Sequence, residues 1–62
     1  MDKIIAILMK RDGLSKKEAT QFLDDVLKDV EDAIANGDWE DAEDIWMGDT
    51  GLEVDYLMEV LM

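Results

Sequence analysis

The chain contains no cysteine, no histidine and no proline, and it has only four glycines among its 62 residues. Without cysteine no disulfide can form, and without cysteine or histidine a structural zinc site is excluded. The same two absences remove the commonest general base and the thiol nucleophile of enzymes. Few glycines and no proline are typical of helices joined by brief turns. We therefore expect an all-α protein that is not an enzyme.

Carboxylates that could bind a hard cation such as calcium are abundant, but their spacing does not match an EF-hand. That loop requires glycine at its sixth position and glutamate at its twelfth. Counting from Asp38, the sixth residue is Glu43, and counting from Asp49 it is Val54. We expect no metal ion and no cofactor.

The sequence also lacks an apolar run of about 18 residues, which a membrane-spanning helix needs. Its start, Met1 to Lys3 followed by the apolar segment 4–9, is too short for a signal peptide and has no small-residue cleavage site. We expect a cytoplasmic protein that makes no membrane contact and forms a single domain, residues 1–62. A domain of this size buries only about 60% of the surface of its unfolded chain, so self-association would help to stabilise it.

Basic residues are scarce, and they are unevenly distributed. The chain has 17 acidic residues against six basic ones, a net charge of −11. Residues 1–20 hold five of the bases against three acids, a net charge of +2, whereas residues 21–62 hold fourteen acids against Lys28 alone, a net charge of −13. Such an excess of negative charge repels nucleic acid and anionic membranes and attracts basic protein surfaces.

Residues 15–36 carry the clearest helical pattern in the sequence. Ser15 and Glu18 have the spacing of a capping box, and Asn36-Gly37 tolerates the backbone conformations that end a helix. Between these limits, apolar residues recur every three to four positions, as on the buried face of an amphipathic helix. They are Ala19, Phe22, Leu23, Val26, Leu27, Val30, Ala33 and Ile34. We predict that this helix is the spine of the domain.

Three further helices are expected around this spine. Residues 2–11 begin with Asp2 as a cap, and residues 38 to about 47 begin with Asp38 as a cap. A last helix, residues 52–62, follows a break at residues 48–51. Its expected core residues are Leu52, Val54, Leu57, Met58 and Leu61. The sequence therefore predicts a compact bundle of about four short helices.

The first of these helices is apolar on almost every side between Ile4 and Met9. A short β-strand is the rival interpretation, but a lone strand would have no partner. A helix that is apolar all round needs cover on all sides, and a 62-residue monomer covers one side most easily. We therefore expect Ile4, Ile5 and Leu8 to form a self-association surface in a homodimer.

The segment NGDWEDAEDIW, residues 36–46, resembles the mid-repeat turn of tetratricopeptide units, in which a Gly-Asp-aromatic-acid-acid-Ala run joins two antiparallel helices. Those repeats recur about every 34 residues and need several copies to bury a core. No second copy is present. The resemblance therefore implies only a helical hairpin between the second and third helices.

Acidic residues dominate the outer face of the spine helix and the start of the third helix. Residues four apart on a helix lie about 6 Å from each other, a spacing comparable to that of phosphates along a DNA strand. We expect these residues to bind a basic partner. The predicted surface comprises Asp24, Asp25, Asp29, Asp32, Glu40, Asp41, Glu43 and Asp44.

In size, charge and helix content the chain is similar to the small acidic proteins of phages and mobile elements that act as anti-CRISPR and anti-restriction inhibitors. The segments KRDGLSKKEA and GLEVDYLMEVL also resemble stretches of short phage-type proteins. The resemblance implies an inhibitor that mimics DNA, binds a nuclease or a guide-RNA effector in the host cytoplasm, and makes no direct contact with nucleic acid.

The alternative is a helical protein–protein interaction or self-association module in which the acids serve solubility and steering. Its five methionines would supply an adaptable apolar surface. Trp39 and Trp46 lie seven residues apart, on one face of the third helix. We expect both in the core, whereas an exposed tryptophan would indicate a binding role.

Overall fold

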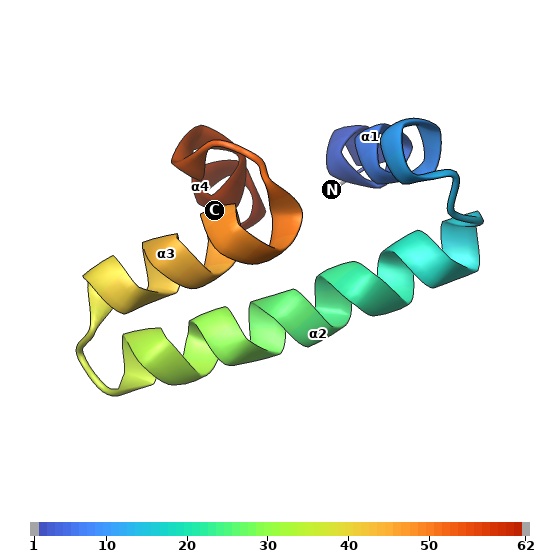
Figure 1. The fold of residues 1–62 in the computed structure, drawn as a ribbon. Coiled ribbons are helices and arrows are strands. Elements are labelled where there is room, and N and C mark those ends of the chain that lie inside the picture. Colours follow the sequence, from blue (N-terminus) through green and yellow to red (C-terminus); the bar gives the residue numbers. More distant parts are fainter. Residues whose placement is uncertain (1, 62) are drawn as a thin grey trace.

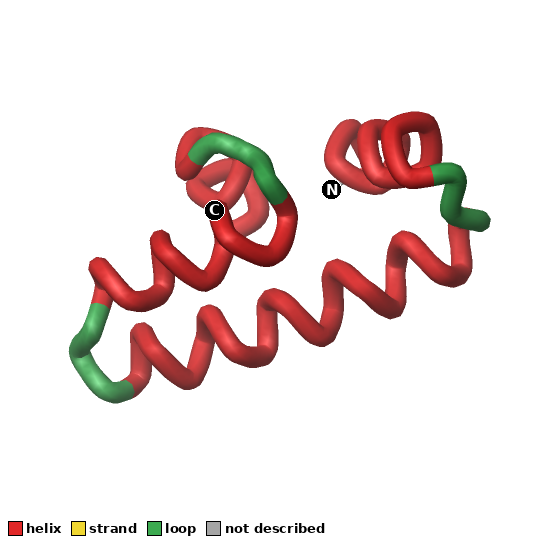
Figure 2. Tube along the Cα trace, in the orientation of Figure 1, coloured by secondary structure: helices red, strands yellow, loops and turns green. Residues whose placement is uncertain are grey.

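The computed structural model describes residues 2–61, which form four α-helices and no strand (Figures 1 and 2). The helices are α1 (Asp2–Asp12), α2 (Lys16–Ala35), α3 (Trp39–Thr50) and α4 (Val54–Leu61). The predicted all-α bundle is thus confirmed. The predicted capping side chain of Asp2, and Met62 at the end of the predicted last helix, lie outside the described part of the chain.

Helix α2 is the platform of the molecule. Its 20 residues correspond to about 30 Å of helix. This is close to the longest dimension of the folded molecule, 33 Å. Figure 1 shows α1 over the first half of α2, and α3 returning antiparallel along its second half, with α4 on the same side of the platform. The hairpin of α2 and α3 is the arrangement that the turn at residues 36–46 predicted.

Local hydrogen bonds define both ends of α2. At its start, Glu18 N–H donates to Ser15 Oγ (3.1 Å) and Ser15 N–H donates to Glu18 Oε1 (3.0 Å), which confirms the predicted capping box. Because the Ser15 N–H stabilises the charged form of the carboxylate, the pKa of Glu18 is lowered. At the other end, Asn36 N–H donates to Asp32 O, and Gly37 takes a φ of +77°, a conformation that glycine adopts without steric penalty.

One apolar core lies between α2 and the other three helices. The largest fully buried side chain is that of Trp46, from α3. The buried apolar residues are Ile4, Ile5, Leu8, Ala19, Leu23, Val26, Val30, Ala33, Ala42, Trp46 and Leu57. Each helix contributes at least one residue to this set, so the four helices share a common core.

The prediction of a self-association surface on α1 is contradicted by the burial of its three residues. Ile4, Ile5 and Leu8 are all buried inside the chain, so these side chains are not available to a second copy. The sequence interpretation was wrong because Ile4, Ile5 and Leu8 form the one side of α1 that the chain itself covers. The solvent-facing side of α1 is instead formed by Ala6, Met9 and the basic residues.

Helix α3 continues past the predicted break at Gly48 and ends at Thr50. The buried Thr50 hydroxyl donates to Trp46 O (2.6 Å) and accepts a hydrogen bond from Leu52 N–H (3.1 Å). The reversal occurs at Gly51, which has a φ of +69°. Glycine within a helix is disfavoured by only about 1 kcal/mol, and the burial of Trp46 and Thr50 together with these local hydrogen bonds outweighs that preference.

Helix α4 is rotated about its axis relative to the prediction. Leu57 is buried as expected, but Met58 and Leu61, predicted as core, are 43% and 38% exposed. Tyr56 and Val60 pack against the core instead. In addition, Trp46 Nε1–H donates to Glu53 O (3.0 Å), which ties the start of α4 to the core side of α3. Among residues 2–61, no helix combines the length and apolar composition that a bilayer crossing requires.

Candidate functional site

The carboxylates predicted to bind a basic partner face solvent. Seven of the eight side chains are exposed, and the eighth, Glu43, is half-buried. The exposed ones are Asp24, Asp25, Asp29 and Asp32 on α2, and Glu40, Asp41 and Asp44 on α3. Both helices therefore bury their apolar stripe and present carboxylates, but the acids do not all share one face.

The four predicted partner-binding acids of α2 divide between two flanks of the helix. Successive residues are rotated by about 100° around an α-helix, so Asp25, Asp29 and Asp32 follow one another along one flank, hereafter the α2 ridge. Asp24 points about 100° away from Asp25, on the flank that also carries Glu31. Within the ridge, Gln21 Nε2 donates to Asp25 Oδ1 (3.1 Å). The structure thus supports the α2 ridge and separates Asp24 from it.

On α3, three of the four predicted acids lie together. Glu40, Glu43 and Asp44 line a shallow, open hollow together with Met47. Asp41 is not part of this hollow. It lies in the first turn of α3, where its backbone N–H donates to the capping Asp38 Oδ1 (3.1 Å). Asp41 is therefore separate from the group that could contact a partner at the hollow.

The negative charge of the molecule is not compensated internally. Among the side chains of residues 3–61, the structure shows a single ion pair, between Arg11 Nη2 and Asp12 Oδ2 at 3.0 Å. Its hydrogen bond raises the pKa of Arg11 and lowers that of Asp12. Within this described part of the chain, none of the fourteen acids after residue 20 takes part in an ion pair. Their field therefore extends into solvent, screened only by salt.

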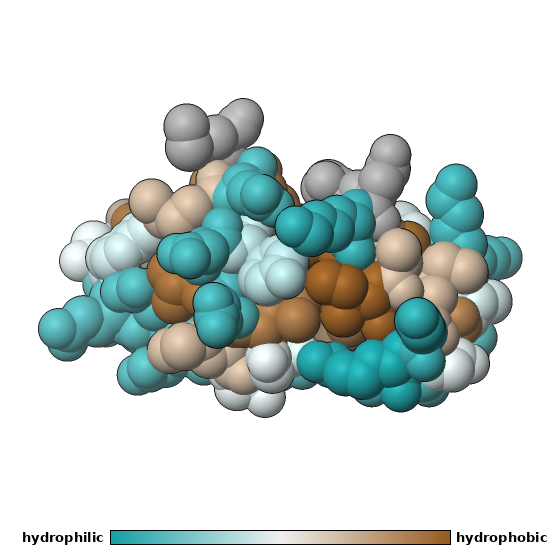
Figure 3. All heavy atoms as spheres, turned by 90° about the horizontal axis from the view of Figure 1, so that it is seen from above, coloured by the Kyte–Doolittle hydropathy of each residue, from teal (hydrophilic) through white to brown (hydrophobic). Residues whose placement is uncertain are grey.

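Two apolar side chains of α3 are substantially exposed. Trp39 is 40% exposed and Met47 is 43% exposed, whereas Trp46 is fully buried. The prediction that both tryptophans belong to the core is therefore wrong for Trp39, which stands at the first position of the helix, where few neighbours cover it. Seen from above, apolar side chains form separate patches between hydrophilic ones (Figure 3).

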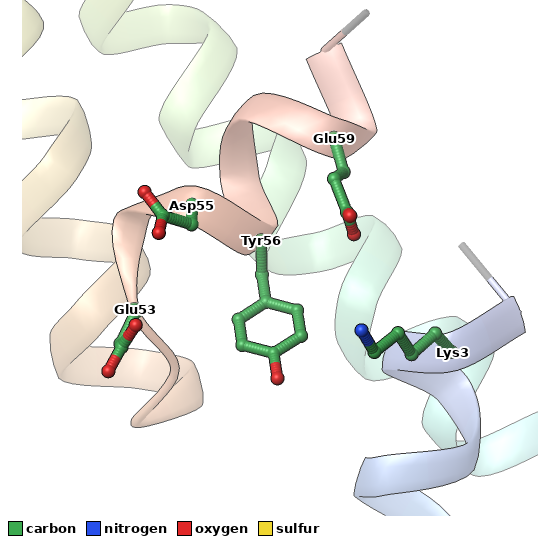
Figure 4. A pocket seen from close by; sticks show the side chains of 5 residues that line it. All are labelled: Lys3, Glu53, Asp55, Tyr56 and Glu59. Carbon is green, nitrogen blue, oxygen red and sulfur yellow. The ribbon is translucent and has the colours of Figure 1, made fainter.

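A second hollow lies where α1 meets α4, and the sequence did not indicate it. The Lys3 ammonium lies 5.5 Å from the centroid of the Tyr56 ring, and Figure 4 shows the two side chains reaching toward each other across the gap. Glu53, Asp55 and Glu59 complete its lining. A cation over an aromatic face is attracted by the ring quadrupole, so this contact joins the first and last helices.

These features can form polar and apolar contacts at the surface. Within residues 2–61, no group of three or more carboxylates is placed to hold a metal ion. The acids lie on open surface rather than in an apolar cavity that would separate their acidities. The exposed carboxylates carry negative charge, and Trp39 and Met47 add exposed apolar side chains on α3.

Comparison with known proteins adds no relative. No family model matches the chain, and neither a curated protein nor a solved structure matches it.

Proposed function

We propose that this protein is a small, non-enzymatic acidic inhibitor that occupies the basic, nucleic-acid-binding surface of a partner protein. The observation that carries the proposal is that fourteen acids after residue 20 are free of ion pairs. A solubility role needs a net charge of only about 2–8 for a small domain. Residues 21–62 exceed that range with a net charge of −13.

The α2 ridge supports the mimicry of nucleic acid. Asp25, Asp29 and Asp32 recur at about one carboxylate per helical turn, so their charges repeat at roughly 5 Å along a straight, rigid axis. A channel that binds phosphates could accept such a row, releasing counterions as it does on binding DNA. Because α2 is capped at both ends, the row is held in place before binding, which reduces the entropy lost on association.

The partner that this chemistry fits is a nuclease, a guide-RNA effector or another protein with a phosphate-binding channel. The proposed setting is the cytoplasm of a host cell, where phage-type anti-defence proteins of similar size and charge act. The resemblance to anti-CRISPR and anti-restriction inhibitors supports this setting. Direct binding of nucleic acid is opposed by charge repulsion.

The decisive experiment neutralises the α2 ridge without changing its shape. We expect the D25N/D29N/D32N variant to retain the wild-type helix content in circular dichroism, because the three side chains are exposed. A matched control, D24N/E31Q/D49N, removes the same number of charges from exposed positions outside the ridge. Wild type, ridge variant and control are each immobilised and used to capture proteins from host lysate at physiological salt, with identification by mass spectrometry.

The proposal expects nucleic-acid-binding proteins to be captured by wild type and control, to be lost from the ridge variant, and to be displaced by added duplex DNA. Displacement by DNA is the critical result because a mimic and nucleic acid compete for one channel. Capture that the ridge variant retains, or that DNA does not affect, would contradict the proposal.

A second function, an interaction or self-association module, is favoured by a different observation. Met58 and Leu61 lie on α4 and are substantially exposed, so this helix offers apolar surface to a second copy. We propose a homodimer through α4 as the alternative. Light scattering at high micromolar concentration tests it: the 7.1 kDa mass of one chain would exclude the dimer, and twice that mass would support it.

A further inference from the structure

A row of side chains that begins at Trp39, on the side of α3 that carries the buried Trp46, and winds toward the solvent-facing side combines apolar and acidic groups in a regular pattern. Trp39, Glu43 and Met47 follow one another at intervals of four residues, and Glu40 and Asp44 form the neighbouring row. We call these five residues the α3 strip. Trp39 and Met47 are separated by about 12 Å along the helix axis, from the rise of 1.5 Å per residue. The carboxylates of Glu43, Glu40 and Asp44 lie between these two apolar ends.

We propose that the α3 strip binds an amphipathic helix of a partner protein that carries arginine or lysine beside two apolar side chains. This inference rests on the proposed function, since it assigns the same basic partner a second contact. The apolar side chains of the partner would pack on Trp39 and Met47, and its cations would pair with the three carboxylates. The α2 ridge attracts the partner through charge, and the α3 strip adds contacts at short range.

Charge complementarity selects this occupant over two others. Nucleic acid would be repelled by Glu40, Glu43 and Asp44, and it offers no apolar side chain to cover Met47. The same strip on a second copy would bring six carboxylates together, which is destabilising in a desolvated contact. A guanidinium satisfies the strip best, because it pairs with carboxylates and stacks on an aromatic face such as that of Trp39.

The geometry favours a helix over an extended segment. Each backbone N–H and C=O that is buried in a contact needs a hydrogen-bond partner, and the outer face of α3 has no free backbone groups to supply one. A helix satisfies its own backbone. Its side chains about seven residues apart lie on one face, separated by roughly 10.5 Å, which is close to the interval between Trp39 and Met47.

Trp39 makes the interaction directly observable. Trp46 is fully buried and hydrogen-bonded to Glu53 O, so a change in tryptophan emission on binding reports Trp39. The probe is a synthetic helical peptide of about five turns, with two leucines about seven residues apart on one face and arginines beside them. The control peptide has the same composition, with the two leucines on opposite faces.

We expect the probe to shift tryptophan emission to shorter wavelength at physiological salt, and the control peptide to bind at least about 10-fold more weakly. The shift should be absent in Trp39→Phe. Met47→Ser should weaken binding at least about 10-fold, whereas Met58→Ser should not. Met58 is the matched control because it is 43% exposed, as Met47 is, but lies on α4. Circular dichroism checks that each variant is folded.

Three outcomes would overturn the inference. The two peptides could bind equally, Met47→Ser could leave the affinity unchanged, or emission could remain constant while the peptide binds. In each case the proposed function would stand if duplex DNA still displaces the captured partner and the ridge variant fails to bind it. The opposite combination is also informative. Probe binding that depends on Met47 would support the α3 strip, and failure of duplex DNA to displace the captured partner would contradict the mimicry.

Discussion

Helix α1 and the hairpin of α2 and α3 are held in the fold in different ways. Helices α2 and α3 form a hairpin closed by local hydrogen bonds, among them Asp38 N–H to Ala33 O at 2.9 Å. Among the described residues, no backbone hydrogen bond of this kind joins α1 to α3 or α4. Helix α1 is held by the buried side chains of Ile4 and Leu8 and by the contact of Lys3 with the Tyr56 ring.

The first 20 residues and the rest of the chain also differ in charge. Residues 1–20 carry a net charge of +2, and residues 21–62 carry −13. The fold brings bases of the first region toward the second, because Lys3 contacts α4 and Arg11 lies beside Gly51. The basic region is therefore attracted to the acidic remainder, while the α2 ridge and the α3 strip have no base paired with them. Apolar burial anchors α1, and charge adds a smaller attraction.

The largest predicted effect tests the apolar anchor. Leu8→Ala should lower the free energy of unfolding by about 2–5 kcal/mol, because it leaves a cavity beneath α1. Chemical denaturation measures the loss. Met9→Ala is the control: Met9 is exposed, so its loss should stay within about 0.5 kcal/mol. A small loss for Leu8→Ala together with a change in mass by light scattering would instead make Leu8 a dimer contact.

The next effect concerns the turn at Gly51, which the Arg11 side chain of α1 approaches. Gly51→Ala should destabilise the protein by roughly 1–2 kcal/mol, because φ is +69° and the added Cβ would lie 3.3 Å from Arg11 Nη1. Gly48→Ala should have the opposite sign, stabilising by about 0.5–1 kcal/mol, because Gly48 is helical and nothing lies within 4 Å of an added Cβ.

Thermal unfolding of the two alanine variants provides a matched pair, three residues apart, with the same chemical change. If Gly48→Ala were the destabilising one, α3 would end at Gly48, as the sequence alone predicted. A neutral Gly51→Ala would show that the turn has another backbone conformation available.

The parts of the fold that follow from local chemistry were predictable. The limits of α2 depend on Ser15 with Glu18 and on Asn36-Gly37, which interact within a few residues of each other. The α2–α3 hairpin follows in the same way from the turn that Gly37 and Asp38 form. The exposure of the acids was also accessible, because the apolar residues of α2 recur at helical intervals and leave the acids on the outside.

The remaining features depend on contacts distant in sequence. Helix α4 has only eight residues, and so many are apolar that its pattern does not specify which side is buried. The Trp46 contact with Glu53 and the packing of Tyr56 orient it. Burial of Ile4 requires the other helices to be in place. Trp39 and Trp46 are identical in type and share one face, yet only Trp46 lies where neighbouring helices cover it.

The smallest predicted effect tests the charge contribution to α1. Lys3→Met and Tyr56→Leu, singly and combined, form a double-mutant cycle, which isolates the pairwise energy. We expect a coupling of about 0.5–1 kcal/mol at low salt, the range for an exposed cation–π contact. Chemical denaturation at two salt concentrations measures it. Because Lys3 lines the same hollow as Glu53 and Glu59 (Figure 4), its single substitution should lose more than the coupling alone, and that excess should shrink as salt screens the carboxylates. A coupling of zero would mean that Ile4 and Leu8 hold α1 without help from Tyr56, and that the basic region contributes only long-range attraction.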